Sequence, residues 1–337
     1  MITVSLCMIV KNEEAVLARC LDSLQGLVDE FIIVDTGSSD RTIEIAGAYT
    51  GKVYHYSWDD DFSHARNYAL SLATCDYIYC ADADEVLDEE NRIRFLQLKQ
   101  TLLPEIEIVQ MLYSGQYDSN TVYNFNEEYR PKLFKRLRSF YFQDPIHETL
   151  RLDPIVYDSD IRIFHKPHGL HTERDICIFK KNYLPKDAPV LPLRLIKMYA
   201  KELFISGTDD QFVSSVPIFT RAVESDNCSK EALLYASCVL ARAYRLSGDI
   251  TNFFKYAMKA TLSDSCSEIC MELGTYYESL GDLNEAHIWY YNAAYETAPI
   301  CNIHLGGDTA LYALAHIMEL AGLSEQAQHY RMEAKKG

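Results

Sequence analysis

Two carboxylates at alternate positions after an apolar run are the clearest candidates for chemistry in this sequence. Asp82 and Asp84 come directly after the apolar residues 77–81. Side chains two positions apart on an extended segment point to the same face. Mg²⁺ and Mn²⁺ prefer one or two carboxylates together with the phosphate oxygens of a substrate. The pair therefore predicts a Mn²⁺ or Mg²⁺ site for a phosphate compound; the alternative is an acidic turn exposed to solvent.

The segments around this pair alternate between strand and helix patterns. Such alternation predicts an α/β domain with a parallel sheet, which binds ligands outside the carboxyl ends of its strands. Beyond Pro104 the pattern changes to antiparallel strands. The expected strands are residues 2–10, 30–34, 53–56, 76–81, 105–116 and 121–129, and the expected helices are residues 17–24, 43–49 and 62–72.

A basic patch follows these strands in an otherwise acidic chain. Clustered cations predict a wall that faces a phosphate or an acceptor, and the alternative is an ordinary solvated face. The patch consists of Arg130, Lys132, Lys135, Arg136 and Arg138.

Composition limits the class of protein. The chain has 337 residues, of which 48% are hydrophobic and 24% charged, so about two globular domains are expected. A net charge of −17 argues against nucleic acid and anionic membranes as partners. The ten cysteines have no framework spacing, which favours reduced thiols. We expect no signal peptide, because the apolar start lacks a basic leader, and a cytoplasmic location.

The C-terminal half has the periodicity of a helical repeat. Gly248 and Gly281 follow equivalent helices and are 33 residues apart, close to the tetratricopeptide period. Three prolines between residues 185 and 192 predict a domain boundary, which gives domains of residues 1–184 and 190–337. Such repeats form curved surfaces that bind a peptide or another subunit. The alternative is that this domain only supports the first one or forms a homodimer contact.

Four short blocks in the first 90 residues resemble the family 2 glycosyltransferases, which have the GT-A fold with a Rossmann-like mixed sheet. The likeness is greatest to the bacterial subgroup with an appended tetratricopeptide-like domain, which includes the sublancin-type peptide glycosyltransferase. The order and spacing of the blocks carry the resemblance. They are CMIVKNEE at residues 7–14, IVDTGSSDRT at 33–42, DFSHARN at 61–67 and ADADE at 81–85.

The resemblance implies a pocket for a nucleotide-diphosphate sugar, with a UDP-sugar as the expected donor. Asp35 would accept the ring N–H of uracil, and Asn12 and Glu13 would line the nucleotide pocket. Arg66 and Asn67 would face the ribose and diphosphate, beside Asp82. The competing interpretations are local: Asp35 caps a turn, and Arg66 pairs with Asp61 or Asp82.

Two later blocks extend the resemblance. Glu148 in QDPIHE would act as the general base of an inverting transfer, and His147 would orient it or contact the donor. The alternative is a His–Glu turn pair without chemistry. In IFHKPHG, either His165 or His168 would complete the metal shell of Asp82 and Asp84, and the register leaves both open.

The resulting prediction is a metal-dependent inverting glycosyltransferase whose acceptor is a peptide, a protein or a glycan. One alternative is a nucleotidyltransferase, although the loop after the first strand, residues 11–14, is acidic and lacks the glycines that hold a triphosphate. Another is a tetratricopeptide scaffold with an inactive catalytic domain. A dinucleotide-binding dehydrogenase is excluded, because no GxGxxG follows the first strand.

Overall fold

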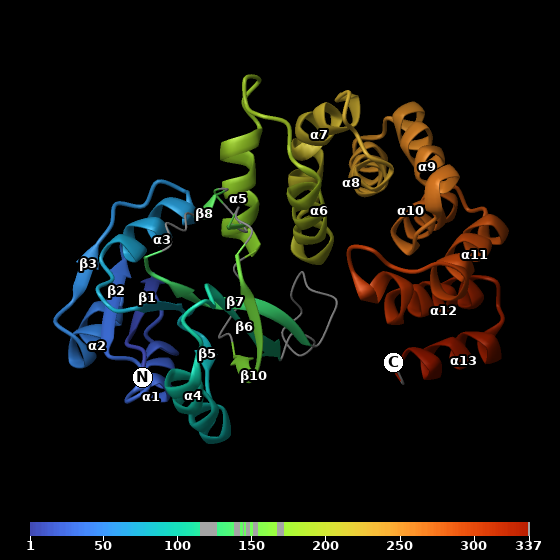
Figure 1. The fold of residues 1–337 in the computed structure, drawn as a ribbon. Coiled ribbons are helices and arrows are strands. Elements are labelled where there is room, and N and C mark those ends of the chain that lie inside the picture. The colour runs from blue at the N-terminus through green and yellow to red at the C-terminus, as the bar shows by residue number, and fades with distance from the viewer. Residues whose placement is uncertain are drawn as a thin grey trace. The chain divides into compact units, whose positions relative to one another are not determined.

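The computed structural model describes residues 1–114, 127–137, 142–143, 145, 149–150, 154–166 and 172–335. It divides into two compact units, Met1–Leu170 and His171–Gly337, which Figure 1 draws in blue to yellow-green and in yellow-green to red. The first unit is an α/β domain and the second is built from helices. This confirms the expected combination of a GT-A-like catalytic fold with a helical repeat domain.

An eight-stranded mixed sheet forms the centre of the first unit, in the order β3-β2-β1-β4-β7-β6-β10-β5. The half β3-β2-β1-β4 is parallel, as the alternating pattern predicted. A separate two-stranded sheet pairs β8 with β9. The strands are β1 Val4–Val10, β2 Glu30–Asp35, β3 Val53–His55, β4 Tyr77–Cys80, β5 Glu85–Val86, β6 Ile108–Ser114, β7 Glu127–Lys135, β8 Phe142–Gln143, β9 Thr149–Leu150 and β10 Val156–His165.

Helices cover both faces of this sheet. Apolar residues of α1, α2 and α4 pack with one face of the central strands, and Ala69 of α3 packs with the other. Leu17, Cys20 and Leu21 of α1 are fully buried, which explains the helical spacing of apolar residues in the sequence. The helices are α1 Leu17–Leu24, α2 Thr42–Tyr49, α3 Phe62–Ser71 and α4 Glu89–Thr101.

The second predicted antiparallel strand lies further along the chain than expected. β7 begins at Glu127, whereas the predicted strand covered residues 121–129, of which 121–126 lie outside the described residues. β7 pairs antiparallel with both β4 and β6, so long-range pairing fixes its position. Most of the basic patch is therefore part of a central strand and not of a surface loop.

The sheet topology brings the carboxyl ends of several strands to the same side of the sheet. β1, β2 and β4 are parallel, so Val10, Asp35 and Cys80 end at the same side. β7 reverses direction, β6 reverses it again, and β10 is parallel to β6. The end of β10 consequently lies at the same edge as the end of β4. The pairing of Glu85 with His165 then joins the acidic segment to the end of β10.

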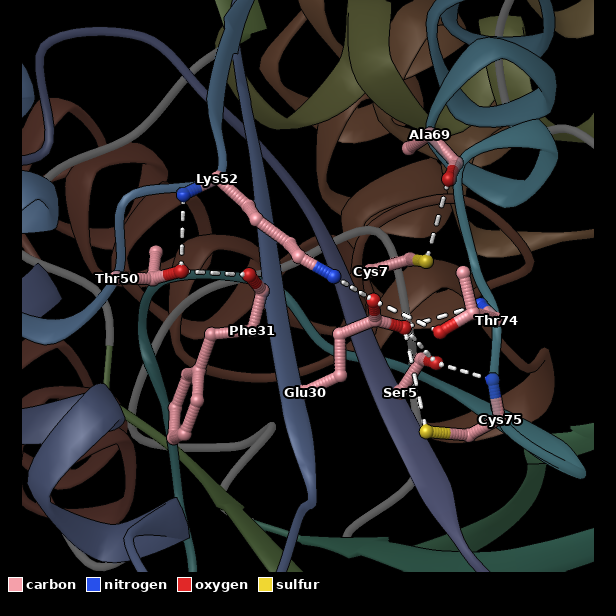
Figure 2. A network of polar contacts seen from close by, with 9 residues as sticks. All are labelled: Ser5, Cys7, Glu30, Phe31, Thr50, Lys52, Ala69, Thr74 and Cys75. Atoms are coloured by element: carbon pink, nitrogen blue, oxygen red, sulfur yellow. Dashed lines mark hydrogen bonds and ion pairs between the residues drawn. The ribbon is translucent and has the colours of Figure 1, made fainter.

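A polar network centred on Glu30, the first residue of β2, lies at the opposite end of the parallel strands (Figure 2). Its carboxylate accepts hydrogen bonds from Ser5 and from the backbone and side chain of Thr74, and it forms an ion pair with Lys52. Ser5 in turn accepts from the Cys75 N–H at 3.1 Å. The network ties β1, β2 and the turn before β4 together, far along the strands from the acidic segment.

The second unit consists of successive antiparallel helix pairs, as the repeat pattern predicted. Gly248, Gly281 and Gly322 end three helices with φ of +76° to +77°, a conformation that favours glycine. Gly274 of α10 lies against Tyr290 of α11, and an added Cβ would be 2.5 Å from the Tyr290 ring. The helices are α5 Thr172–Tyr183, α6 Leu193–Ser206, α7 Asp209–Glu224, α8 Lys230–Ser247, α9 Ile250–Asp264, α10 Ser267–Ser279, α11 Leu283–Tyr291, α12 Asp308–Leu320 and α13 Ser324–Ala334.

The division between the units comes earlier in the chain than the expected boundary at residues 184–190. α5 belongs to the helical unit, because Phe179 stacks on Tyr199 of α6 with 4.4 Å between ring centroids. Tyr199 also stacks on Phe219 of α7 at 5.2 Å. The proline-rich connector therefore lies within the second unit. In the described part of the chain, no helix has both the length and the apolar character that crossing a membrane requires.

Candidate active site

Three carboxylates follow β4, and each contacts a basic side chain from a different element. Asp82 Oδ1 is 3.5 Å from Arg66 Nη2 of α3. Asp84 Oδ2 is 3.0 Å from His165 Nε2 at the end of β10. Glu85 forms a buried ion pair with Lys132 of β7. The acidic segment is thus contacted from three directions, and the predicted residues form two separate contacts at the carboxyl end of the strands, Arg66 with Asp82 and His165 with Asp84.

Asp82 is the most accessible of the three carboxylates, with 46% of its side chain exposed. Burial acts to raise its pKa, but the charge of Arg66, followed by Lys132, Arg130 and His165, lowers the pKa to about 2. Asp82 is therefore ionised at neutral pH and can bind a cation. Arg66 pairs with Asp82, as one of the local interpretations anticipated.

Asp84 and His165 have the separation of neighbouring ligands in an octahedral metal shell. Two ligand atoms at about 2.1 Å from a metal and at right angles are about 3.0 Å apart. Both side chains are partly open to solvent, each 16% exposed. A carboxylate and an imidazole suit Mn²⁺ and also Mg²⁺ when phosphate oxygens complete the shell. Two of the predicted ligands therefore fit such a metal.

A complete protein cage for a metal is absent from the part of the chain that the structure describes, where no three His, Cys, Asp or Glu side chains cluster suitably. The other predicted histidine ligand, His168, lies outside the described residues. His165 lies against Tyr113 of β6, with ring centroids 5.3 Å apart and the ring planes tilted by 36°.

Sequence reasoning did not single out Glu85 and Lys132 as a pair. Glu85 is 2% exposed, and burial raises its pKa to about 7, although the ammonium of Lys132 acts to lower it. The negative charges of Asp82 and Asp84 raise the pKa further. The sequence did contain one indication of this pair. Arg130 and Lys132 are two positions apart on one strand, so their side chains point to the same face.

The basic patch divides between the two ends of β7. Arg130 lies over the Tyr113 ring, with its guanidinium carbon 3.9 Å from the centroid, and Lys132 Nζ is 5.2 Å from the same centroid. At the other end, Lys135 donates to the carbonyl of Pro104 and Arg136 to that of Cys75. Arg130 and Lys132 therefore belong to the candidate site, whereas the latter two have structural contacts. Arg138 lies outside the described residues.

Asp35 closes a turn at the end of β2, as the local interpretation predicted. Its carboxylate accepts hydrogen bonds from the N–H groups of Gly37 at 3.0 Å and Ser38 at 3.1 Å. Gly37 has φ of +102°, which this turn requires of a residue without a Cβ. His55 at the end of β3 places Nδ1 3.6 Å from Asp35 Oδ2. Only 3% of the Asp35 side chain is exposed.

The loop after β1 is bonded to the loop after β2. Asn12 donates its backbone N–H to Ser38 Oγ at 3.0 Å, and its side-chain oxygen accepts from the Ser39 N–H at 2.8 Å. The backbone N–H of Glu13 donates to Thr42 Oγ1 at 2.7 Å. The first two sequence blocks therefore form one joined rim beside Asp35, and part of their pattern has a structural cause.

The third block forms the start of α3, where Asp61 accepts hydrogen bonds from the N–H groups of Ser63 and His64 as an N-cap. The Phe62 N–H donates to the carbonyl of Pro145 at 2.9 Å. Pro145 lies in the loop between β8 and β9, so this loop begins beside the helix that carries Arg66. Asn67, one position further along α3, is half-buried.

Two predicted catalytic residues, His147 and Glu148, lie outside the described residues, so their role stays a prediction.

The parallel half-sheet continues into antiparallel strands, and carboxylates follow its strand β4. Residues 5–149 match the family model described as Glycosyl transferase family 2. This part of the first unit is therefore similar to the family 2 glycosyltransferases, and the helical unit follows it in the same chain.

Two curated proteins match part of the chain. A TPR repeat-containing protein of Synechococcus elongatus is 41% identical over 152 residues, which are 44% of this chain and 36% of that protein. The glycosyltransferase SunS of Bacillus subtilis is 26% identical over 170 residues, which are 50% of this chain and 40% of that protein. The chain thus spans well under half the length of these relatives.

Among solved structures, glucosyl-3-phosphoglycerate synthase from Mycobacterium tuberculosis, in complex with Mn²⁺, UDP and phosphoglyceric acid, is 18% identical. The match covers 56% of this chain and 82% of that one, with a TM-score of 0.40.

Proposed function

We propose that this protein is an inverting glycosyltransferase that transfers a sugar from a UDP-sugar in the presence of Mn²⁺ or Mg²⁺. The observations that carry the proposal are the carboxylates of Asp82 and Asp84 after β4 and the contact of Asp84 with His165, in a unit whose residues 5–149 match the family 2 model. Asp84 and His165 would hold the metal, with Asp82 beside them. When bound, the metal would neutralise the charge of the departing diphosphate.

The chain's own cations would assist the same step. Arg66 lies 3.5 Å from Asp82 and is largely buried, so it is placed to contact the diphosphate once a metal occupies the carboxylates. Arg130 and Lys132 add positive charge on the β7 side. A positive environment around the leaving group stabilises charge that develops in the transition state.

Base recognition is assigned to Asp35, with Asn12 and Glu13 on the neighbouring rim and Asn67 near the ribose. Asp35 already accepts two backbone N–H groups, but a carboxylate has about four acceptor positions. A uracil N3–H would use one that remains. His55, which approaches Asp35, lies on the same rim and is largely exposed.

The general base would be Glu148, oriented by His147. An inverting transfer needs a carboxylate across the sugar from the leaving diphosphate, to take the proton of the attacking group. The support comes from the sequence block and from Pro145, whose carbonyl accepts from Phe62 at the start of α3.

The acceptor is proposed to be a peptide, a protein or a glycan, and the helical unit would bind it or form a homodimer. Stacked helix pairs provide extended surfaces for this purpose.

The nucleotidyltransferase alternative is disfavoured by the loop after β1. The backbone N–H groups of Asn12, Glu13 and Glu14 donate to side chains of Ser38, Thr42 and Asp40. They are consequently not directed at a triphosphate, which such enzymes hold with free N–H groups of a glycine-rich loop. An inactive scaffold is disfavoured because the carboxylates after β4 retain cations within contact distance.

The experiment is a screen of UDP-, GDP- and CDP-sugars for slow hydrolysis in the presence of Mn²⁺. We expect release of UDP from at least one UDP-sugar by the parent protein and none above background by Asp84→Ala. Equal hydrolysis by both proteins would remove Asp84 from the metal site. A preference for another base would correct the donor assignment.

A further inference from the structure

We propose that the Glu85–Lys132 ion pair, called here the anchor pair, is a positioning device that holds Asp82 and Asp84 in the geometry that binds the metal. The inference rests on the proposed metal dependence of the reaction. It concerns two residues that do not themselves reach the substrate, because both side chains are buried, with 2% of Glu85 and 8% of Lys132 exposed.

The backbone around Glu85 connects the acidic segment to the end of β10. The Glu85 N–H donates to the carbonyl of Asp82 at 3.2 Å, which closes the turn between them. Glu85 pairs with His165 in the antiparallel register of β5 and β10. The Lys166 N–H donates to the carbonyl of Asp84 at 2.9 Å. Any shift of Glu85 would therefore move Asp84 relative to His165.

The side chain of Glu85 fixes this backbone from the other side. Lys132 extends from an irregularity of β7, where the register with β6 passes from Leu133 to Pro131, and Leu133 beside it pairs with both β4 and β6. The Lys132 Nζ lies 5.2 Å from the centroid of Tyr113, and the same ring lies against His165, tilted by 36° with ring centroids 5.3 Å apart. The anchor pair and the imidazole ligand thus share one aromatic support.

The three side-chain contacts of the acidic segment differ in how far they are exposed to solvent. Asp82 is partly exposed and pairs with Arg66 at 3.5 Å, a distance at which a metal can replace the contact. Asp84 and His165 are also partly open. Only the anchor pair is buried on both sides. A metal can therefore reorganise the first two pairs while the third remains and keeps the backbone in place.

A positioning role and a purely structural role predict different effects on the stability of the protein when the pair is removed. A buried ion pair contributes little net stability, because desolvation offsets its attraction, and apolar replacements of both partners are often neutral or stabilising. In the described part of the chain, Glu85 Oε2 is buried and has no hydrogen-bond partner, which weakens the pair's contribution further. Removing the whole pair should therefore spare the fold and disturb the metal site.

The test replaces both partners in the full-length protein, as Glu85→Met together with Lys132→Met. The readouts are Mn²⁺ binding to the nucleotide-free protein by electron paramagnetic resonance, Mn²⁺-dependent UDP binding by calorimetry, and the thermal midpoint. We expect Mn²⁺ affinity to fall about 10- to 100-fold, as for other groups that orient metal ligands. The thermal midpoint should be unchanged or higher.

Two controls match the anchor pair. Lys135→Met removes a lysine from the same strand whose Nζ contacts the Pro104 carbonyl, and it should leave Mn²⁺ affinity at the parental value. Glu30→Gln disturbs a Glu–Lys pair with a buried carboxylate and a half-exposed lysine at the opposite end of the parallel strands (Figure 2), and it should lower stability without changing Mn²⁺ affinity. If the double variant does not fold, Glu85→Gln takes its place, because Gln keeps the shape of the side chain and removes its charge.

Parental Mn²⁺ affinity in the double variant, or in Glu85→Gln, would overturn the proposal. A fall in Mn²⁺ affinity that is matched by Glu30→Gln would also overturn it, since the effect would then follow general stability. Failure of the proposed function looks different: the parent protein itself would bind UDP equally with and without Mn²⁺.

Discussion

The polar network around Glu30 gives a prediction whose size follows from the structure. Glu30 is buried at the start of β2, and its carboxylate accepts from Ser5 and Thr74 and pairs with Lys52 (Figure 2). Burial acts to raise the Glu30 pKa, but these hydrogen bonds outweigh it and lower the pKa from the usual 4.5 to about 2. The perturbation is Glu30→Gln, which imitates the protonated acid in shape.

A pKa that falls from 4.5 to about 2 corresponds to about 3 kcal/mol of stability at neutral pH. The folded-state pKa is depressed, so this contribution is complete above the unfolded value of 4.5 and is lost as the pH falls through about 2. Near pH 3, roughly half of it should remain. We therefore expect Glu30→Gln to cost about 3 kcal/mol at pH 7 and at pH 5, and about half of that at pH 3.

Urea unfolding monitored by tryptophan fluorescence measures the difference in unfolding free energy between the parent protein and Glu30→Gln in the first unit alone. The chain has two tryptophans, Trp58 in the first unit and Trp289 in the second. A Trp289→Phe background leaves Trp58 as the reporter, and it removes an indole N–H that is buried without a partner in the described structure. A difference in unfolding free energy below about 1 kcal/mol at pH 7 would refute the electrostatic reasoning. A difference at pH 3 as large as the one at pH 7 would also refute it.

Two further predictions concern the reaction. Asp35→Asn should reduce the ratio of UDP to CDP affinity about tenfold, because an ionised carboxylate only accepts and so favours the uracil N3–H, whereas the amide of Asn can also donate to the bare cytosine N3; an unchanged ratio in calorimetry would leave Asp35 as a turn residue. Glu148→Gln should keep donor affinity and lower the turnover number by roughly 10²- to 10⁴-fold, the usual effect of removing a general base. Near-normal turnover at saturating donor and acceptor would contradict the base assignment.

The local parts of the fold could be predicted from the sequence. The first four strands and the helices between them have apolar periodicities that their own burial explains, as for Leu17, Cys20 and Leu21 of α1. The helix pairs of the second unit were predicted for the same reason, with Gly248 and Gly281 at their ends in the left-handed conformation. These features depend on neighbours in the sequence.

Features that depend on long-range pairing were not predictable in the same way. The position of β7 is set by its pairing with β4 and β6, and this pairing brings Lys132 to Glu85 across 47 residues of sequence. The division between the units lies before α5 and not in the proline-rich connector that follows it, because Phe179 of α5 stacks on Tyr199 of α6. The resemblance to a family left His165 and His168 open as partners of the acidic pair, and the structure has His165 Nε2 3.0 Å from Asp84, a contact that spacing alone did not indicate.

The role of Asp35 illustrates a limit of motif reasoning. The same carboxylate matches the family's base-binding position and also closes its own turn through Gly37 and Ser38. Both roles call for an Asp at the end of β2, so the motif alone does not separate them. The affinity ratio described above does so, because damage to the turn would weaken UDP and CDP binding alike.

The central claim is that the acidic edge of the first unit binds a nucleotide diphosphate through a divalent metal. Calorimetry of UDP with the full-length protein, with and without Mn²⁺, tests it most directly. We expect UDP binding that requires Mn²⁺ in the parent protein and is lost in Asp84→Ala, with the thermal midpoint of the metal-free protein little changed. UDP affinity that is equal with and without Mn²⁺, or equal in the parent and Asp84→Ala, would contradict the account.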